Sequence, residues 1–170
     1  LKIGEELNDI LSLVLTKTYL GIGFWYTCEF AKALHYFAKA LEINVSANAL
    51  WGISSLKAWI AEVIITQGKI DLGYTISDEA LRIADESGDI FSKAHAYTAH
   101  GWSYYYKGYL KEAEKYLLQG ADFSVRINML FYAATAHFGL GITFFDMEEY
   151  TKSQMHYENA ISVYRDGNIM

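Results

Sequence analysis

The sequence predicts an all-α protein made of stacked helical hairpins. Three observations predict this fold: an internal repeat that returns every forty positions, apolar positions three, four and seven residues apart within each repeat, and a chain of 170 residues without proline. Spacings of three, four and seven place side chains on one face of a helix. Without proline, the helices can run without internal breaks.

Three series of small residues carry the repeat. The series are Gly21, Ala61, Gly101 and Gly141; then Ala33, Gly73, Ala113 and Ser153; then Ala40, Ala80, Gly120 and Ala160. Two antiparallel helices approach closely only where their side chains are small. We therefore expect these positions to mark the contact between the two helices of each hairpin, for example between Gly141 and the second helix of its own repeat.

The register places the helices in order along the chain. We expect the first helices at 10–27, 48–67, 90–107 and 130–146, and the second helices at 30–45, 70–86, 110–126 and 149–165. Gly68 and Gly108 stand at equivalent places where a helix C-cap and turn are expected, and Cys28 and Glu148 hold that place in the other two repeats. A second type of turn is expected at Ser87–Gly88–Asp89.

The same register predicts one repeat domain over residues 1–170. Residues 1–9 are expected to be the tail of a preceding repeat, because Leu1-Lys2-Ile3 matches Leu81-Arg82-Ile83 two repeats later, and Asp9 matches Asp89 in the same way. The four repeats are then 10–47, 48–89, 90–128 and 129–170. Since solenoids need polar capping helices, and none is recognisable at either end, we expect a fragment of a longer protein.

The repeat resembles the tetratricopeptide repeat family, whose motif has Leu-Gly, an aromatic residue three positions on, and then Ala, an aromatic residue and Ala on the second helix. Repeat one reads Leu20-Gly21, Phe24, Ala33, Phe37 and Ala40, and repeat four reads Leu140-Gly141, Phe144, Ser153, Tyr157 and Ala160. The resemblance covers the whole chain and implies a right-handed superhelical stack, a TPR-like α-solenoid. The period of forty is longer than the usual value of about 34 residues. It is similar to arrays in large bacterial signalling proteins that carry a regulatory ATPase, a nucleotide cyclase or a transcriptional activator.

The resemblance also implies a binding surface. Positions spaced i, i+4 and i+7 on each first helix line the concave groove of a tetratricopeptide superhelix. Here they are Thr18, Ile22 and Trp25; Ala58, Glu62 and Ile65; Thr98, Trp102 and Tyr105; and Phe138, Ile142 and Phe145. We expect partner contacts from Trp25, Ile22, Glu62, Trp102, Tyr105, Phe138, Ile142 and Phe145. Two interpretations stay open: an exposed apolar groove, or core buried between repeats. A carboxylate clamp is not expected, because these positions hold no asparagine or lysine.

Composition restricts the partners and the chemistry. A net charge of −6 and a pI of about 5.3 disfavour nucleic acid, which needs a basic surface. Cys28 is the only cysteine, so neither an internal disulfide nor a thiolate metal cluster is possible, in keeping with a reducing cytoplasm. The apolar stretches 10–26 and 49–66 contain charged residues, Lys17 in the first and Lys57 and Glu62 in the second, so we expect no membrane span.

Catalytic and metal-binding patterns are lacking in the sequence. No His-Glu-x-x-His motif is present, and no metal or cofactor is expected. We expect His100 and His137 to be partly buried and hydrogen-bonded, and His35, His95 and His156 to lie on the surface. The pairs Gly21-Ile22-Gly23 and Gly139-Leu140-Gly141 lack the further glycine and lysine of a phosphate loop and fall inside predicted helices.

We therefore expect a protein–protein interaction scaffold within a larger signalling protein, and not an enzyme. The partner would be a protein or peptide segment, which could belong to another domain of the same parent chain. Two alternatives stay open: a regulatory array that senses a small molecule, and a homodimerisation module. Self-association is expected to involve the apolar end residues Leu7, Leu11, Tyr157 and Ile161.

Overall fold

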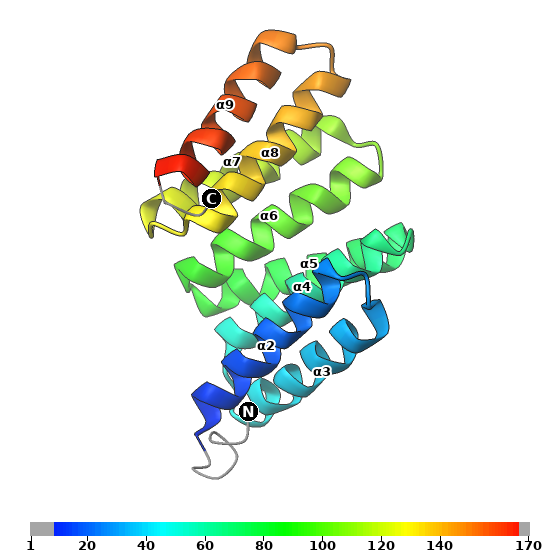
Figure 1. Ribbon diagram of the computed structural model, residues 1–170, viewed down its shortest axis with the longest axis vertical. Coiled ribbons are helices and arrows are strands. Elements are labelled where there is room, and N and C mark those ends of the chain that lie inside the picture. Colours follow the sequence, from blue (N-terminus) through cyan, green and yellow to red (C-terminus); the bar gives the residue numbers. More distant parts are fainter. Residues whose placement is uncertain (1–8, 167–170) are drawn as a thin grey trace. The chain divides into compact units, whose positions relative to one another are not determined.

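The computed structural model describes residues 9–166, and these residues form an α-helical chain (Figure 1). Within them there are eight helices. They are α2 (Ile10–Tyr26), α3 (Phe30–Ser46), α4 (Leu50–Thr66), α5 (Ile70–Ser87), α6 (Ile90–Tyr106), α7 (Leu110–Arg126), α8 (Leu130–Asp146) and α9 (Tyr150–Asp166). Each begins and ends within two residues of the range expected from the sequence. The all-α fold of TPR-like helical hairpins is confirmed.

In the part of the chain that the structure describes, none of these helices is both long and apolar enough to cross a membrane. The expected tail of a preceding repeat, including Leu7, lies outside the described residues except for Asp9.

Left-handed backbone marks every connection from α2 to α9. Residues with positive φ occur at even intervals along the chain: Cys28, Asn48, Gly68, Gly88, Gly108, Asn128 and Glu148. Gly68 and Gly108 have φ of 79° and 81°, as expected for glycine after a helix C-terminus. Cys28 and Glu148 adopt the same region at 59° and 61°, where a Cβ costs about 1–2 kcal/mol. One helix and its connection therefore make up half of the sequence repeat.

The N-termini of α2 and α6 are capped in the same way. The Asp9 carboxylate accepts a hydrogen bond from the backbone N–H of Ser12 at 3.3 Å, and the Asp89 carboxylate accepts one from the N–H of Ser92 at 2.8 Å. An aspartate at this place satisfies one of the unpaired amides of the first helical turn. The two caps stand two repeats apart, so the repeat register extends to the helix ends.

Glycine allows the two helices of a hairpin to touch. A Cβ at Gly21 would lie 2.6 Å from the Phe37 ring, and a Cβ at Gly141 would lie 2.7 Å from the Tyr157 ring. At Gly101 it would lie 2.7 Å from the side chain of Leu117 in α7. Real Cβ atoms do not approach that closely, so any larger residue would push the helices apart. The expected contact between Gly141 and the second helix of its own hairpin is confirmed.

The chain divides into two compact units, residues 1–87 (the N-terminal unit) and 88–170 (the C-terminal unit). In the N-terminal unit α2 pairs with α3, α4 pairs with α5, and α3 contacts α4; in the C-terminal unit α6 pairs with α7, α8 pairs with α9, and α7 contacts α8. The stacked rings of Phe37 and Trp59 join the hairpins of the N-terminal unit. The core of the C-terminal unit contains Leu117, Leu140 and Phe144. One domain of four repeats over residues 1–170 stays a prediction.

Two histidines depart from expectation. His95 and His156 were expected on the surface, but they are 0% and 6% exposed. The His95 ring stacks on Tyr132 with centroids 4.5 Å apart, and the His156 ring stacks on Phe144 at 5.3 Å. Each of these two rings lies flat against an aromatic ring of another helix, and this packing accounts for its burial. His100 is buried, more completely than expected.

Candidate interaction surface

We use the name groove stripe for the twelve first-helix positions that the sequence singled out, three on each of α2, α4, α6 and α8. In the N-terminal unit, Trp25 joins two first helices. Its indole Nε1–H donates a hydrogen bond to the Thr66 hydroxyl at 3.3 Å, and its ring meets Trp59 edge-on with centroids 5.6 Å apart. Trp25 stays partly exposed. It is therefore both a structural contact and an accessible aromatic surface.

In the C-terminal unit, Trp102 and Tyr105 hold the corresponding place between α6 and α8. A Cβ at Gly139 would lie 3.0 Å from the Trp102 indole, so this aromatic ring lies against backbone. The Tyr105 hydroxyl donates a hydrogen bond to the Asp146 carboxylate at 2.9 Å. Burial and the neighbouring Asp146 raise the pKa of Tyr105 to about 12, so this phenol stays protonated and a donor at neutral pH.

One contact recurs between successive first helices. Trp25 bonds to Thr66 and Tyr105 bonds to Asp146, in each case across the same separation in sequence. The last stripe position of one hairpin thus donates to the last residue of the next first helix. This link was not predicted from the sequence, although the polar residues Thr66 and Asp146 at equivalent positions could have indicated it.

The stripe varies in exposure along its length. Ala58, Ile65 and Thr98 are buried at 0%, 4% and 0%. Phe138 and Phe145, both on α8, are 49% and 56% exposed. The remaining positions are half-buried: Thr18, Ile22, Trp25, Glu62, Trp102, Tyr105 and Ile142. The largest exposed side chains of the stripe therefore lie on α8, while the buried positions contribute to packing.

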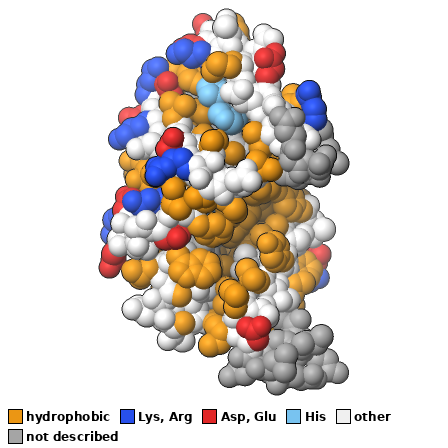
Figure 2. Space-filling model, turned by 90° about the vertical axis from the view of Figure 1, so that its left-hand side faces the viewer, with side chains coloured by type: hydrophobic (Ala, Val, Ile, Leu, Met, Phe, Trp, Pro, Cys, Tyr) orange, Lys and Arg blue, Asp and Glu red, His pale blue; other side chains and the backbone are white. Residues whose placement is uncertain are grey.

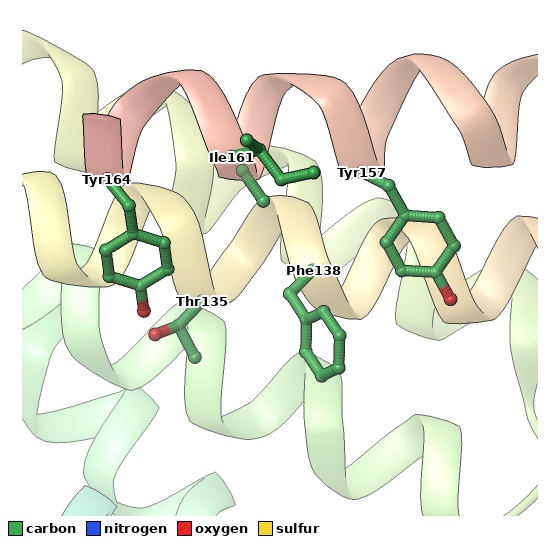
Figure 3. Close-up of a pocket in the computed structure, with 6 residues that line it drawn as sticks. Thr135, Phe138, Tyr157, Ile161 and Tyr164 are labelled. Atoms are coloured by element: carbon green, nitrogen blue, oxygen red, sulfur yellow. The ribbon is translucent and has the colours of Figure 1, made fainter. Parts of the chain in front are cut away.

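Figure 2 shows one face of the molecule, on which hydrophobic side chains are widely exposed and most charged side chains lie toward the left of the view. An open cavity of about 480 Å³ lies between α8 and α9. We name it the end pocket. Its lining is Thr135 and Phe138 from α8, with Tyr157, Ala160, Ile161 and Tyr164 from α9. Figure 3 shows the labelled side chains on one side of this helix pair. Of these residues, the sequence had indicated Phe138 as a stripe position, Ala160 as a small position of the repeat, and Tyr157 and Ile161 as end residues; Thr135 and Tyr164 were not predicted.

A histidine pair joins the same two helices. The Nδ1 atoms of His137 and His156 lie 3.0 Å apart, so one neutral imidazole donates to the other. Burial lowers the pKa of His137; burial, and then the charge of His137, lower the pKa of His156. Both rings are therefore neutral near pH 7.

The described residues offer little for catalysis. No group of three or more histidine, cysteine, aspartate or glutamate side chains within residues 9–166 could hold a metal ion. The two Gly-x-Gly sequences lie inside α2 and α8. Cys28 is exposed in the turn between α2 and α3.

Comparison with known proteins shows likeness in fold. No protein-family model matches the chain, and no curated protein matches its sequence. A Rap protein complexed with Competence and Sporulation Factor is similar, with a TM-score of 0.78 and 20% identity over 92% of this chain and 44% of its own. BtubC (BKLC) from P. vanneervenii has a TM-score of 0.73 and 16% identity over 97% of this chain and 68% of its own.

The apo form of RapI is also similar, with a TM-score of 0.69 and 13% identity over 96% of this chain and 45% of its own. The chain thus spans less than half the length of the two Rap structures. At these identities the likeness concerns the fold alone, and it supports the assignment of a TPR-like helical repeat.

Proposed function

We propose that this chain is a protein-binding module that uses its groove stripe to hold an apolar segment of a partner. One observation carries the proposal: Phe138 and Phe145 are 49% and 56% exposed on α8, a helix that is otherwise packed against α7 and α9. Large aromatic side chains left uncovered by the fold are typical of interaction sites and dominate their binding energy. The proposed contact residues are Ile22, Trp25, Glu62, Trp102, Tyr105, Phe138, Ile142 and Phe145.

The surroundings of the stripe favour binding because they fix its side chains before a partner arrives. Trp102 lies against Gly139, and the hydroxyl of Tyr105 is bonded to Asp146. Aromatic rings held in this way lose little conformational entropy on binding. The net charge of −6 favours a neutral or basic partner segment over an acidic one.

The wider context is part of the same proposal. A Rap protein of this fold is complexed with Competence and Sporulation Factor, which supports a role for the fold in holding a partner. We place the module in a larger signalling protein of the cytoplasm, where a chain with a single cysteine needs no oxidising compartment. The partner is then a separate protein or another segment of the parent chain.

A peptide selection tests the proposal. The immobilised chain would be offered a random peptide library displayed on phage, and the enriched peptides would be synthesised and titrated by fluorescence anisotropy. We expect enriched sequences with aromatic or aliphatic anchors. Phe145→Ser should weaken their binding by at least about tenfold, because truncating a central aromatic anchor costs about 2 kcal/mol.

The matched control is Val125→Ser on α7. Val125 is 63% exposed, similar to Phe145, but lies on a second helix outside the stripe. It should leave peptide affinity unchanged, and circular dichroism should show both variants folded. Equal affinities for wild type and Phe145→Ser, or no enrichment at all, would rule out the stripe as a peptide-binding surface.

A further inference from the structure

The end pocket corresponds to a surface that a following helix covers in the C-terminal unit and covers in part in the N-terminal unit. One repeat before its six lining residues stand His95, Thr98, Leu117, Gly120, Ala121 and Ser124, and all six are buried. The helix α8 lies over them, since a Cβ at Gly139 would be 3.1 Å from Leu117. In the N-terminal unit, α4 covers part of the equivalent surface, with Trp59 stacked on the buried Phe37, while Leu15 stays 42% exposed. We name this surface, formed by the two helices of one hairpin, the seat.

In the hairpin of α8 and α9 the seat is open. Phe138 and Ile161 are 49% and 50% exposed, whereas their counterparts Thr98 and Ala121 are 0% and 5% exposed. Five of the six side chains are also larger than in the preceding seat, and only Thr135 is smaller than its counterpart His95. The open seat therefore presents apolar area that α8 covers in the hairpin of α6 and α7.

The helices that cover a seat use one face. On α4 this face is Gly52, Leu56, Trp59 and Val63, and on α8 it is Tyr132, Ala136, Gly139 and Thr143; all eight are buried. The same positions on α2 are Ser12, Thr16, Tyr19 and Gly23. Of these, Ser12, Tyr19 and Gly23 are exposed, Tyr19 by 69%, and Thr16 is half-buried. The helix α2 thus exposes the face that its counterparts bury.

The sizes of the side chains match the open seat to this face of α2. Phe37 in the first seat receives the ring of Trp59, with centroids 6.0 Å apart and planes within 11°. Tyr157 takes the place of Phe37 in the open seat, and Tyr19 takes the place of Trp59 on α2. Aromatic residues thus meet aromatic residues at this position.

At the other end of the seat, a larger residue faces a small one. Asn44 in the first seat lies against Gly52 of α4. Tyr164 takes the place of Asn44, and Ser12 takes the place of Gly52. In the open seat, Tyr164 would therefore face the small residue Ser12 of the docking helix, as Asn44 faces Gly52.

We propose that the open seat binds a second copy of this chain, whose α2 lies between α8 and α9 of the first, with Tyr19 stacked on Tyr157. The contact joins two different faces, so each copy keeps one free seat and one free α2. Copies therefore add head to tail. The open seat shares Phe138 with the proposed peptide groove, so the two proposals are tested at residues that belong to only one of them: Phe145 for the groove, and Ile161 and Tyr19 for the seat.

Sedimentation velocity of the full 170-residue chain over a range of concentrations tests this contact. We expect the weight-average mass of the wild type to rise with concentration beyond a dimer. Tyr19→Asp and Ile161→Asp each place a carboxylate on one of the two faces, and each should sediment as a monomer. Both side chains are at least half exposed, so circular dichroism should show both variants folded.

Mixing the two variants gives the decisive result. The Tyr19→Asp variant keeps an intact seat and the Ile161→Asp variant keeps an intact α2, so an equimolar mixture should form dimers and nothing larger. Val125→Asp, on the exposed face of α7, should associate as the wild type does. A monomeric wild type at every concentration would overturn the proposal. So would a mixture that stays monomeric, or a Tyr19→Asp variant that associates as well as the wild type.

Discussion

His137 and His156 share a hydrogen bond between α8 and α9, and that bond depends on both rings being neutral. Burial lowers both pKa values, and the charge of His137 lowers the pKa of His156 further. The carboxylate of Glu114 on α7 opposes this shift, whereas Lys152 on α9 adds to it. The pair is therefore a local source of acid sensitivity in the C-terminal unit.

The stability of this unit should fall in mild acid. The unfolded state has histidines near their ordinary pKa of 6.5, and the folded state has lower values. At a pH between the folded and the unfolded pKa values, the unfolded state binds more protons than the folded state. The stabilisation by the neutral pair is therefore complete above pH 6.5 and is lost as the pH falls through the folded pKa values. Urea unfolding at about pH 7.5 and about pH 5.5 should show a lower unfolding free energy at the acid value.

A double variant isolates the contribution of the pair. The same two places hold Tyr97 and Tyr116 in the preceding hairpin, with ring centroids 6.0 Å apart. His137→Tyr with His156→Tyr should therefore fold and lose much of the acid dependence. His35→Tyr, on the exposed face of α3, changes a histidine without touching the pair and should behave as the wild type. An unchanged acid loss in the double variant would assign the effect to other groups.

Single residues also show what a sequence can predict about this fold. The small positions were predictable, because large side chains would keep two helices apart, and at Gly101 and Gly141 even a Cβ would clash. The burial of His95 was not, because it depends on a contact with Tyr132 in another helix. The residue type predicts only how exposed histidines are on average, whereas the exposure of His95 depends on the ring that packs against it.

At the scale of one element, the connections control where each helix ends. A residue with positive φ follows each helix from α2 to α8, and glycine holds this place in three of the seven connections. Helix bounds were therefore predictable to within two residues. Exposure of the groove stripe was not, because it depends on what covers each helix. Thr98 is buried and its counterpart Phe138 is 49% exposed at the same place in the register.

Two alanine substitutions in the N-terminal unit separate backbone conformation from packing. Neither Gly68 nor Gly23 has an atom within 4 Å of the place where a Cβ would lie, but Gly68 has a φ of 79° and Gly23 lies within α2. Gly68→Ala should lower the unfolding free energy by about 1 kcal/mol, because alanine is strained in left-handed backbone. Gly23→Ala should raise it by up to about 1 kcal/mol through helix propensity. Thermal unfolding would show opposite shifts, and shifts of the same sign would contradict the assigned backbone at Gly68.

At the scale of the whole molecule, the chain has two compact units, each with its own core. Hairpin repeats are stabilised by contacts within a hairpin and with its neighbours, so cooperativity need not extend along the entire chain. The sequence register alone could not reveal a division after Ser87, because the repeat has the same period on both sides of it. Whether residues 1–170 unfold as one domain is a question of energetics.

Hydrogen exchange of a variant in one unit answers that question. Gly101→Leu would drive a side chain against Leu117, whose backbone nitrogen would lie 2.9 Å from the new Cβ, and overpacking of this kind costs about 1–3 kcal/mol. Because the clash lies in the core of the C-terminal unit, we expect faster amide exchange in α6 to α9, while protection in α2 to α5 stays as in the wild type. The same substitution at Gly23, where the Cβ meets no neighbour, should not speed exchange in either unit. An equal loss of protection in all eight helices of the described chain would instead mean that the repeats unfold as a single cooperative domain.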